Sequence, residues 1–181
     1  MVKYHGLGRR YLMRLGFLMR PLLNGGTLDR RVNPTDPTYP YDDSCVVTYS
    51  TLRVFSDDVR PAEVSHALNL EPTRSFLKGE PISPRVDTPR HQHGWLLCSE
   101  NHVHSRDTRR HLDWLLDLVE RNSEAFASLV SRGVSADIYS YWVSAHGQGG
   151  PILSPPQLAR LARFGLECSY DIYFGGDPED K

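Results

Sequence analysis

Two pairs of histidines are the residues of this sequence that most directly suggest chemistry. They are His91 with His93 and His102 with His104, and they flank an apolar run at 94–99. Alternate residues of a strand share a face, so such pairs can bind zinc or another divalent ion together with a carboxylate such as Glu100 or Asp107. The alternative is that both pairs lie in solvated loops, because the sequence has no H-E-x-x-H or comparable metal signature.

A glycine-rich segment suggests a different site, one for an anion. The segment is Gly147-Gln148-Gly149-Gly150-Pro151. Glycines adopt positive φ and expose backbone N–H groups, and a helix that begins near Ser154 would add a favourable dipole. Arg74 and Lys78 would then supply positive charge. The segment lacks the Lys-Ser/Thr of a phosphate-binding P-loop, so the alternative is a plain connection between a strand and a helix.

The strands predicted at 45–55, 136–144 and 167–174 place a third group of polar and aromatic residues on a common face. The group consists of Arg53, Tyr139, Tyr141, Asp171 and Tyr173. If helices cover only the other side of the sheet, this face suits a second copy of the chain, a partner protein or a ligand with an aromatic or cationic group. The alternative is that the tyrosines pack beneath helices or beneath the N-terminal part of the chain.

Other catalytic signatures are missing from the sequence. It contains no nucleophile elbow and no evident pair of catalytic carboxylates. Cys45, Cys98 and Cys168 are far apart and show no C-x₂-C spacing. They are expected to be buried thiols in a reducing, cytoplasmic compartment, since free cysteine is usually a core residue. The sequence therefore favours a binding protein without cofactor or metal over an enzyme.

Composition and charge exclude several classes of protein. The chain has 181 residues, of which 39% are hydrophobic and 24% charged, with a formal net charge of −1. These values exclude a collagen, a mostly disordered chain and a strongly basic nucleic-acid binder. No run of 18 apolar residues occurs, so no helix that spans a membrane is expected.

Charge is distributed unevenly and indicates the domain organisation. Residues 1–31 hold seven lysines and arginines against Asp29, and residues 32–181 hold 14 basic and 21 acidic residues, which argues against nucleic acid as a partner. Residues 1–44 are predicted to be a basic extension with a proline-rich linker at its end. One α+β domain is predicted at 45–175, and 176–181 form an acidic tail.

Hydrophobic periodicity and cap residues predict the order β-α-β-β-α-β-α-β. A long loop at 79–93 is expected. Ser105 is the expected N-cap of the longest helix, and Asn122-Ser123 is expected to mark a bend in it. The first six elements have the order of a ferredoxin-like split βαβ unit, which predicts a mainly antiparallel sheet with helices on one face. The predicted strands are 45–55, 73–78, 94–99, 136–144 and 167–174, and the predicted helices are 61–70, 106–132 and 154–165.

An ordered set of short segments resembles a known family. The segments are Leu52-Arg53-Val54-Phe55, Leu70-Glu71-Pro72-Thr73-Arg74, Gly94-Trp95, His111-Leu112-Asp113-Trp114-Leu115-Leu116, Tyr141-Trp142, Gly147-Gln148-Gly149-Gly150-Pro151 and Asp171-Ile172-Tyr173-Phe174. Together they resemble the bacterial family known as domain of unknown function 4279, over about residues 45–175. The resemblance implies a small cytoplasmic α+β domain. It supplies no activity and no catalytic residues, and residues 1–44 lie outside it.

The leading hypothesis is a cytoplasmic binding module with a regulatory or toxin-neutralising role. It would act through the sheet face and the glycine-rich loop, with Arg74 and Trp95 lining the same cleft. The partner would be a protein, a small ligand or a second copy of the chain. The second hypothesis is a small metal-dependent hydrolase that uses the histidine pairs.

Overall fold

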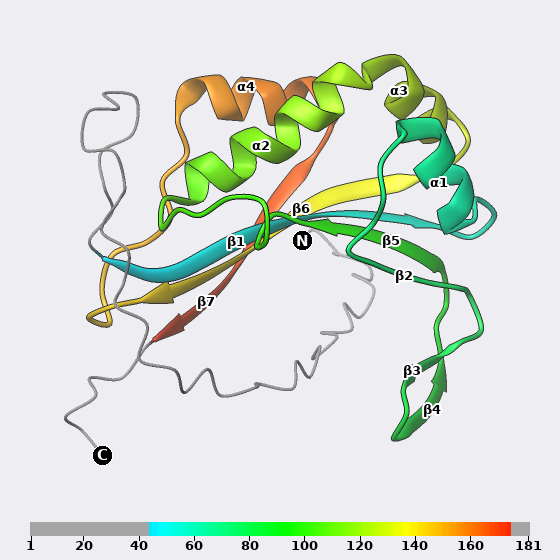
Figure 1. Ribbon diagram of the computed structural model, residues 1–181, viewed down its shortest axis with the longest axis horizontal. Coiled ribbons are helices and arrows are strands. Elements are labelled where there is room, and N and C mark those ends of the chain that lie inside the picture. The colour runs from blue at the N-terminus through cyan, green and yellow to red at the C-terminus, as the bar shows by residue number, and fades with distance from the viewer. Residues whose placement is uncertain (1–43, 175–181) are drawn as a thin grey trace, which may run out of the picture. The chain divides into compact units, whose positions relative to one another are not determined.

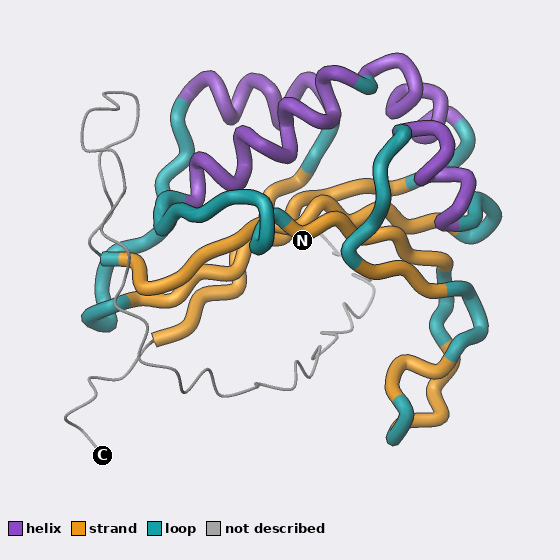
Figure 2. Tube along the Cα trace, in the orientation of Figure 1, coloured by secondary structure: helices purple, strands orange, loops and turns teal. Residues whose placement is uncertain are grey.

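The computed structural model describes residues 44–174, which form a main five-stranded sheet with four helices on a single face and a separate two-stranded sheet (Figures 1 and 2). The predictions for residues 1–43 and 175–181 lie outside the described residues. The five strands of the sheet are β1 (Cys45–Ser56), β2 (Arg74–Phe76), β5 (His93–Cys98), β6 (Ser135–Ser144) and β7 (Glu167–Phe174).

The sheet is mixed but mainly antiparallel. Its spatial order is β2-β5-β1-β6-β7, with β1 in the centre. Every neighbouring pair is antiparallel except β6 and β7, which run parallel. Because α4 (Pro155–Phe164) connects β6 to β7, this last pair is a strand-helix-strand crossover, the usual way to join parallel neighbours. The α+β class that was predicted is confirmed.

The helices bury one face of the sheet through residues that alternate along the strands. In β1, Leu52 and Val54 are buried, whereas Arg53 and Phe55 are only half-buried. Leu112 and Leu115 pack against the buried side of the sheet as part of the hydrophobic core. The helices are α1 (Pro61–Leu68), α2 (Thr108–Arg121), α3 (Ser123–Ser131) and α4 (Pro155–Phe164).

The structure differs from the predicted element order in two places. The expected loop at 79–93 contains a second, two-stranded sheet made of β3 (Pro81–Ser83) and β4 (Val86–Pro89), because prolines at the ends of an isolated hairpin do not interrupt its few hydrogen bonds. The expected long helix is divided at Asn122 into α2 and α3. The hairpin was not predicted, and at Asn122-Ser123 the sequence indicated only a bend within one continuous helix.

The N-cap of α2 also differs from the prediction. Asp107 caps this helix, and its carboxylate accepts a hydrogen bond from the backbone N–H of Arg109. Ser105 lies two residues before this cap, and its hydroxyl accepts a hydrogen bond from the backbone N–H of Asp107. Both residue types can cap a helix, and the choice depends on where the chain turns to reach the sheet.

Candidate functional site

The side of the sheet opposite the four helices is called here the open face, because no described helix covers it (Figure 1). Strand register places half-buried and exposed residues on it in rows that cross the sheet. One row runs from Arg74 through Leu96, Arg53 and Asp137 to Glu167. Beyond this row, towards the C-terminal end of β6, the same face carries four tyrosines: Tyr49, Tyr139, Tyr141 and Tyr173.

Three of these tyrosines form a continuous aromatic surface. The ring centroids of Tyr49 and Tyr141 are 4.9 Å apart and the rings are stacked. Tyr173 lies 5.2 Å from Tyr141, at an angle of 40°. The hydroxyl of Tyr173 donates to Asp171 Oδ2 at 2.9 Å. This surface joins three strands that lie far apart in the sequence.

Arg53 continues the surface across β1 and β6. Its Nε and Nη2 donate to the two carboxylate oxygens of Asp137 at 2.6 and 2.7 Å, a two-pronged contact. Its guanidinium carbon also lies 4.5 Å from the ring centroid of Tyr139 and 5.8 Å from that of Phe55. The arginine is therefore held in one position by a carboxylate and two aromatic rings.

Burial keeps three tyrosines of the open face, Tyr49, Tyr139 and Tyr141, in the neutral phenol form. Burial, and then the neighbouring Asp171, raise the pKa of Tyr139 well above its usual range. Burial also raises the pKa of Tyr49 and Tyr141. These phenols can donate hydrogen bonds at neutral pH but cannot supply a phenolate nucleophile.

A second stack of residues lies at the β2 edge of the open face. Phe76 pairs with Gly94 across the strands, and its ring lies against the Gly94 backbone. The guanidinium carbon of Arg90 lies 3.8 Å from the centroid of the same ring, so the ring separates Gly94 from Arg90. Sequence reasoning missed Phe76 and Arg90. A glycine inside an apolar strand was the available signal, since it permits close approach of another group.

The residues predicted for the site divide between the two faces. Arg53, Tyr139, Tyr141, Asp171 and Tyr173 lie together on the open face, and exposed Arg74 lies on the same face at its β2 edge. Trp95 does not join them. It is 1% exposed beneath the helices, where its Nε1 donates to Ser65 Oγ of α1 at 3.0 Å, because it follows Gly94 and so points to the opposite face.

The glycine-rich loop lies at the far end of β6 from Arg74, contrary to the expected shared cleft. Arg74 aligns with Asp137 near the beginning of β6, whereas the loop follows Ser144 at its end. The strand between Asp137 and Ser144 is about 23 Å long. Gly147 and Gly149 have the positive φ that was predicted, at 69° and 89°, whereas Gly150, for which it was also predicted, does not.

The loop's geometry has a packing explanation. A Cβ on Gly149 would lie 2.5 Å from Ser44 Oγ, so the glycine allows two chain segments to meet. The helix that follows begins with Pro155 and Pro156, which have no N–H to offer an anion. The N–H of Ser154 donates to Gln157 Oε1 at 3.0 Å. These contacts give the anion-site hypothesis for this loop no support.

The first histidine pair lies at the beginning of β5, which is about 16 Å long, and the second lies in the loop that follows its end. His93 accepts the backbone N–H of Lys78 through Nδ1 at 3.0 Å, and His102 stacks on Trp114 with ring centroids 4.6 Å apart. Among residues 44–174, no three His, Cys, Asp or Glu side chains gather to hold a metal ion. The hydrolase hypothesis therefore finds no support in this part of the chain.

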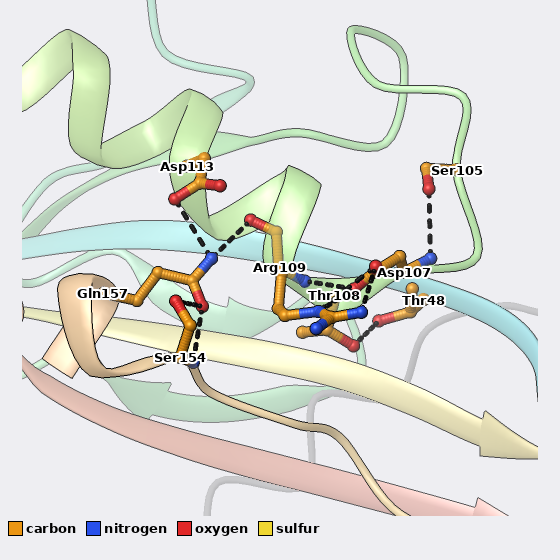
Figure 3. Close-up of polar contacts among 8 residues, drawn as sticks. All are labelled: Thr48, Ser105, Asp107, Thr108, Arg109, Asp113, Ser154 and Gln157. Atoms are coloured by element: carbon orange, nitrogen blue, oxygen red, sulfur yellow. Dashed lines mark hydrogen bonds and ion pairs between the residues drawn. The ribbon is translucent and has the colours of Figure 1, made fainter. Parts of the chain in front are cut away.

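A group of buried polar residues at the start of α2 is the other candidate for a site (Figure 3). The guanidinium of Arg109 donates to both carboxylate oxygens of Asp107 at 2.8–3.2 Å. Thr108 Oγ1 lies 3.0 Å from Thr48 Oγ1 of β1. These polar groups form hydrogen bonds with one another, so their role here is to attach α2 to the sheet rather than to bind a ligand.

Gln157 attaches α4 to the same helix (Figure 3). Its side chain is buried, and Nε2 donates to the carbonyl of Arg109 and to Asp113 Oδ1, both at 3.0 Å. Its Oε1 accepts from the N–H and the hydroxyl of Ser154. Gln157 thus completes the capping box of α4 and also links α4 to α2.

The cysteines are free thiols, as expected. Cys45 is buried, whereas Cys98 and Cys168 are partly buried rather than fully buried. Burial raises the pKa of Cys98 and of Cys168, which makes both thiols poor nucleophiles at neutral pH. None of the four described helices has the length and apolar character that a membrane span requires.

The comparisons with known proteins decide the family. The sequence model of the family called domain of unknown function (DUF4279) matches residues 47–175. This chain belongs to that family. The match includes every strand of the DUF4279 sheet apart from the first residues of β1, and it includes the whole open face. No curated protein and no solved structure matches the chain.

Proposed function

We propose that this DUF4279 chain is a binding module that uses the open face to bind a partner protein. The observation that carries the proposal is the group of tyrosines beside Arg53, three of them half-buried and Tyr173 exposed, on a face where residues 44–174 place no helix. Tyrosine and arginine are enriched at protein interfaces, because each combines a large contact area with polar groups.

The side chains of the open face are already ordered by contacts within the chain. Arg53 is fixed by Asp137 and Tyr139, and Tyr173 is fixed by Asp171 and Tyr141. A partner that binds such a surface immobilises few additional side chains, so the entropy cost of association is small.

A protein fits the open face better than a small molecule does. Small molecules favour concave sites. A hollow of about 730 Å³ lies beside α1 and β2, and another of about 370 Å³ lies between α3, α4 and the start of β6. The tyrosines of the open face line neither hollow.

The proposal also includes a ferredoxin-like topology, a single domain and a cytoplasmic location for this chain. The antiparallel order β2-β5-β1-β6 supports a ferredoxin-like split βαβ unit, to which α4 and β7 are added. The family match at 47–175 supports one domain at 45–175. Free thiols support a reducing, cytoplasmic compartment.

Site-specific photo-crosslinking in cells that express the chain tests the proposal. A photoreactive amino acid replaces Thr51, which lies between Cys98 and Tyr139 on the open face, or exposed Ala127 on α3 as the control. We expect one defined crosslinked partner from position 51 and none from position 127. The double variant Tyr139→Ser/Tyr141→Ser should abolish the product while its circular dichroism stays unchanged.

Equal crosslinking from both positions, or no product from position 51, would contradict a binding role for the open face. A product with twice the mass of the chain would identify the partner as a second copy. A regulatory protein or a toxin as the crosslinked partner would distinguish the two roles expected of such a module.

A further inference from the structure

Arg90 is a buried positive charge without a carboxylate partner among residues 44–174. Its residue is 6% exposed. The other buried ionic side chains of this part of the chain, Asp107 and Arg109, neutralise each other at 2.8 Å. The contact made by Arg90 is a hydrogen bond from Nη2 to the carbonyl of Ile82 at 2.8 Å. A buried charge that no opposite charge neutralises costs folding free energy.

The surroundings hold the Arg90 guanidinium in a fixed orientation. The backbone N–H of Arg90 donates to the carbonyl of Glu80 at 2.8 Å, and its carbonyl accepts from Gly79 N–H at 2.9 Å, which closes the base of the β3–β4 hairpin. The ring of Phe76 covers one flat side of the guanidinium. A guanidinium has five N–H donors on Nε, Nη1 and Nη2. The carbonyl of Ile82 accepts a hydrogen bond from Nη2 of Arg90.

A second arginine adds to the positive charge at this place. Arg74 is exposed and lies on the same face of β2 as Phe76, two residues away. Burial, and then the charge of Arg74, lower the pKa of Arg90, while Glu80 opposes this more weakly. Glu80 forms no ion pair with Arg90 in the described part of the chain. The two positive charges therefore repel each other, and Glu80 offsets this repulsion only in part.

We propose that Arg74 and Arg90 bind an oxyanion, a phosphate or carboxylate group, at the base of the β3–β4 hairpin. The planar guanidinium of Arg90 presents paired donors that match two oxygens of such a group. Stacking on Phe76 fixes the plane of these donors, and Arg74 contributes long-range attraction. The site is independent of the proposed partner protein, because a free anion is sufficient to occupy it.

Titration of the full chain with inorganic phosphate, followed by NMR of backbone amides and arginine Nε groups, tests the site. Sodium chloride keeps the ionic strength constant. We expect saturable shifts at Arg90 Nε and at the amides of Gly79 and Glu80, with a Kd of about 1 mM, the weak affinity typical of one small ion. A parallel titration with acetate distinguishes phosphate from carboxylate as the preferred group.

Variants connect the shifts to the two arginines. Arg90→Gln and Arg74→Gln should each weaken phosphate binding at least tenfold. Arg85→Gln is the matched control, because Arg85 is an exposed arginine of the same hairpin, and it should leave binding unchanged. Arg90→Lys keeps the charge but loses the paired donors, so it should weaken binding severalfold while the hairpin stays folded.

Shifts that do not saturate, or that Arg85→Gln reduces as much as Arg90→Gln does, would mean an adventitious ion only. Unchanged binding in Arg74→Gln and Arg90→Lys would also overturn the site. Both results would leave the crosslinking test of the open face unaffected, since Thr51 lies outside the arginine pair.

Discussion

Gly94 lies directly beneath the ring of Phe76, and a Cβ atom placed on Gly94 would overlap that ring. The two residues are cross-strand partners at the β2 edge, so the ring can lie flat on the sheet only where its partner has no side chain. Arg90 covers the other side of the ring. One glycine thereby determines where an aromatic ring and a buried charge sit.

Replacing this glycine should therefore destabilise the protein. Gly94→Ala forces the Phe76 ring away from the sheet, and we expect the free energy of unfolding to fall by about 1–3 kcal/mol, as for overpacked sites. Urea denaturation measures it. Gly150→Ala is the control, because Gly150 has open space around it and no positive φ, and a change beyond about 0.5 kcal/mol there would question the comparison.

The two-pronged pair of Arg53 and Asp137 should contribute measurably to stability. Their side chains are 22% and 28% exposed, so water screens them only in part. A double-mutant cycle with Arg53→Ala and Asp137→Ala should give a coupling energy of about 1 kcal/mol, the upper end for ion pairs near a surface. The pair of Arg132 and Glu63 is nearly half exposed and should give a smaller coupling. Equal couplings would contradict this account.

Acidification should weaken the protein through buried His111. Its Nδ1 lies 2.8 Å from Ser99 Oγ and its Nε2 lies 2.8 Å from the carbonyl of Ser105. Burial lowers the pKa of His111 below its ordinary value. The unfolded chain therefore binds the proton first, so this contribution to stability is complete above about pH 6.5 and is lost as pH falls towards the lowered pKa.

Unfolding in urea at pH 7.5 and pH 5.5 measures this dependence on the His111 ring. His111→Leu should lower stability at pH 7.5, since it leaves Ser99 and the Ser105 carbonyl without their partner. The variant should also lose less stability than the wild type between the two pH values. An identical pH dependence in both proteins would assign the effect to other groups.

The link between α2 and α4 through Gln157 should be costly to remove. Gln157→Leu removes the acceptor of the half-buried Ser154 N–H and the hydrogen bonds from Gln157 Nε2 to the Arg109 carbonyl and Asp113, which we expect to cost about 1–3 kcal/mol. Thermal unfolding with a two-state fit measures the loss. Leu158→Gln, at the exposed neighbouring position, is the matched control and should be almost neutral. A similar loss in both variants would show that α4 itself tolerates little change.

Local patterns predicted most of the elements correctly. Alternation in 167–174 predicted β7 with its correct bounds, and Ser154-Pro155 predicted the beginning of α4. The β3–β4 hairpin was missed, because its three prolines resemble a loop and its strands have only three or four residues. Trp95 was placed in the wrong cleft, since an apolar run such as 94–99 has no alternation from which its buried face can be read.

The sequence by itself determined which residues share a strand face, because side chains alternate along any extended chain. It thereby predicted that Tyr139 and Tyr141 belong together. Only the tertiary structure decided which strands are neighbours, since pairing depends on contacts between distant segments. The central position of β1 brings Arg53 to Asp137, 84 residues away, and the unforeseen hairpin brings Arg90 to Phe76. Long-range packing, rather than local propensity, thus assembled both candidate sites.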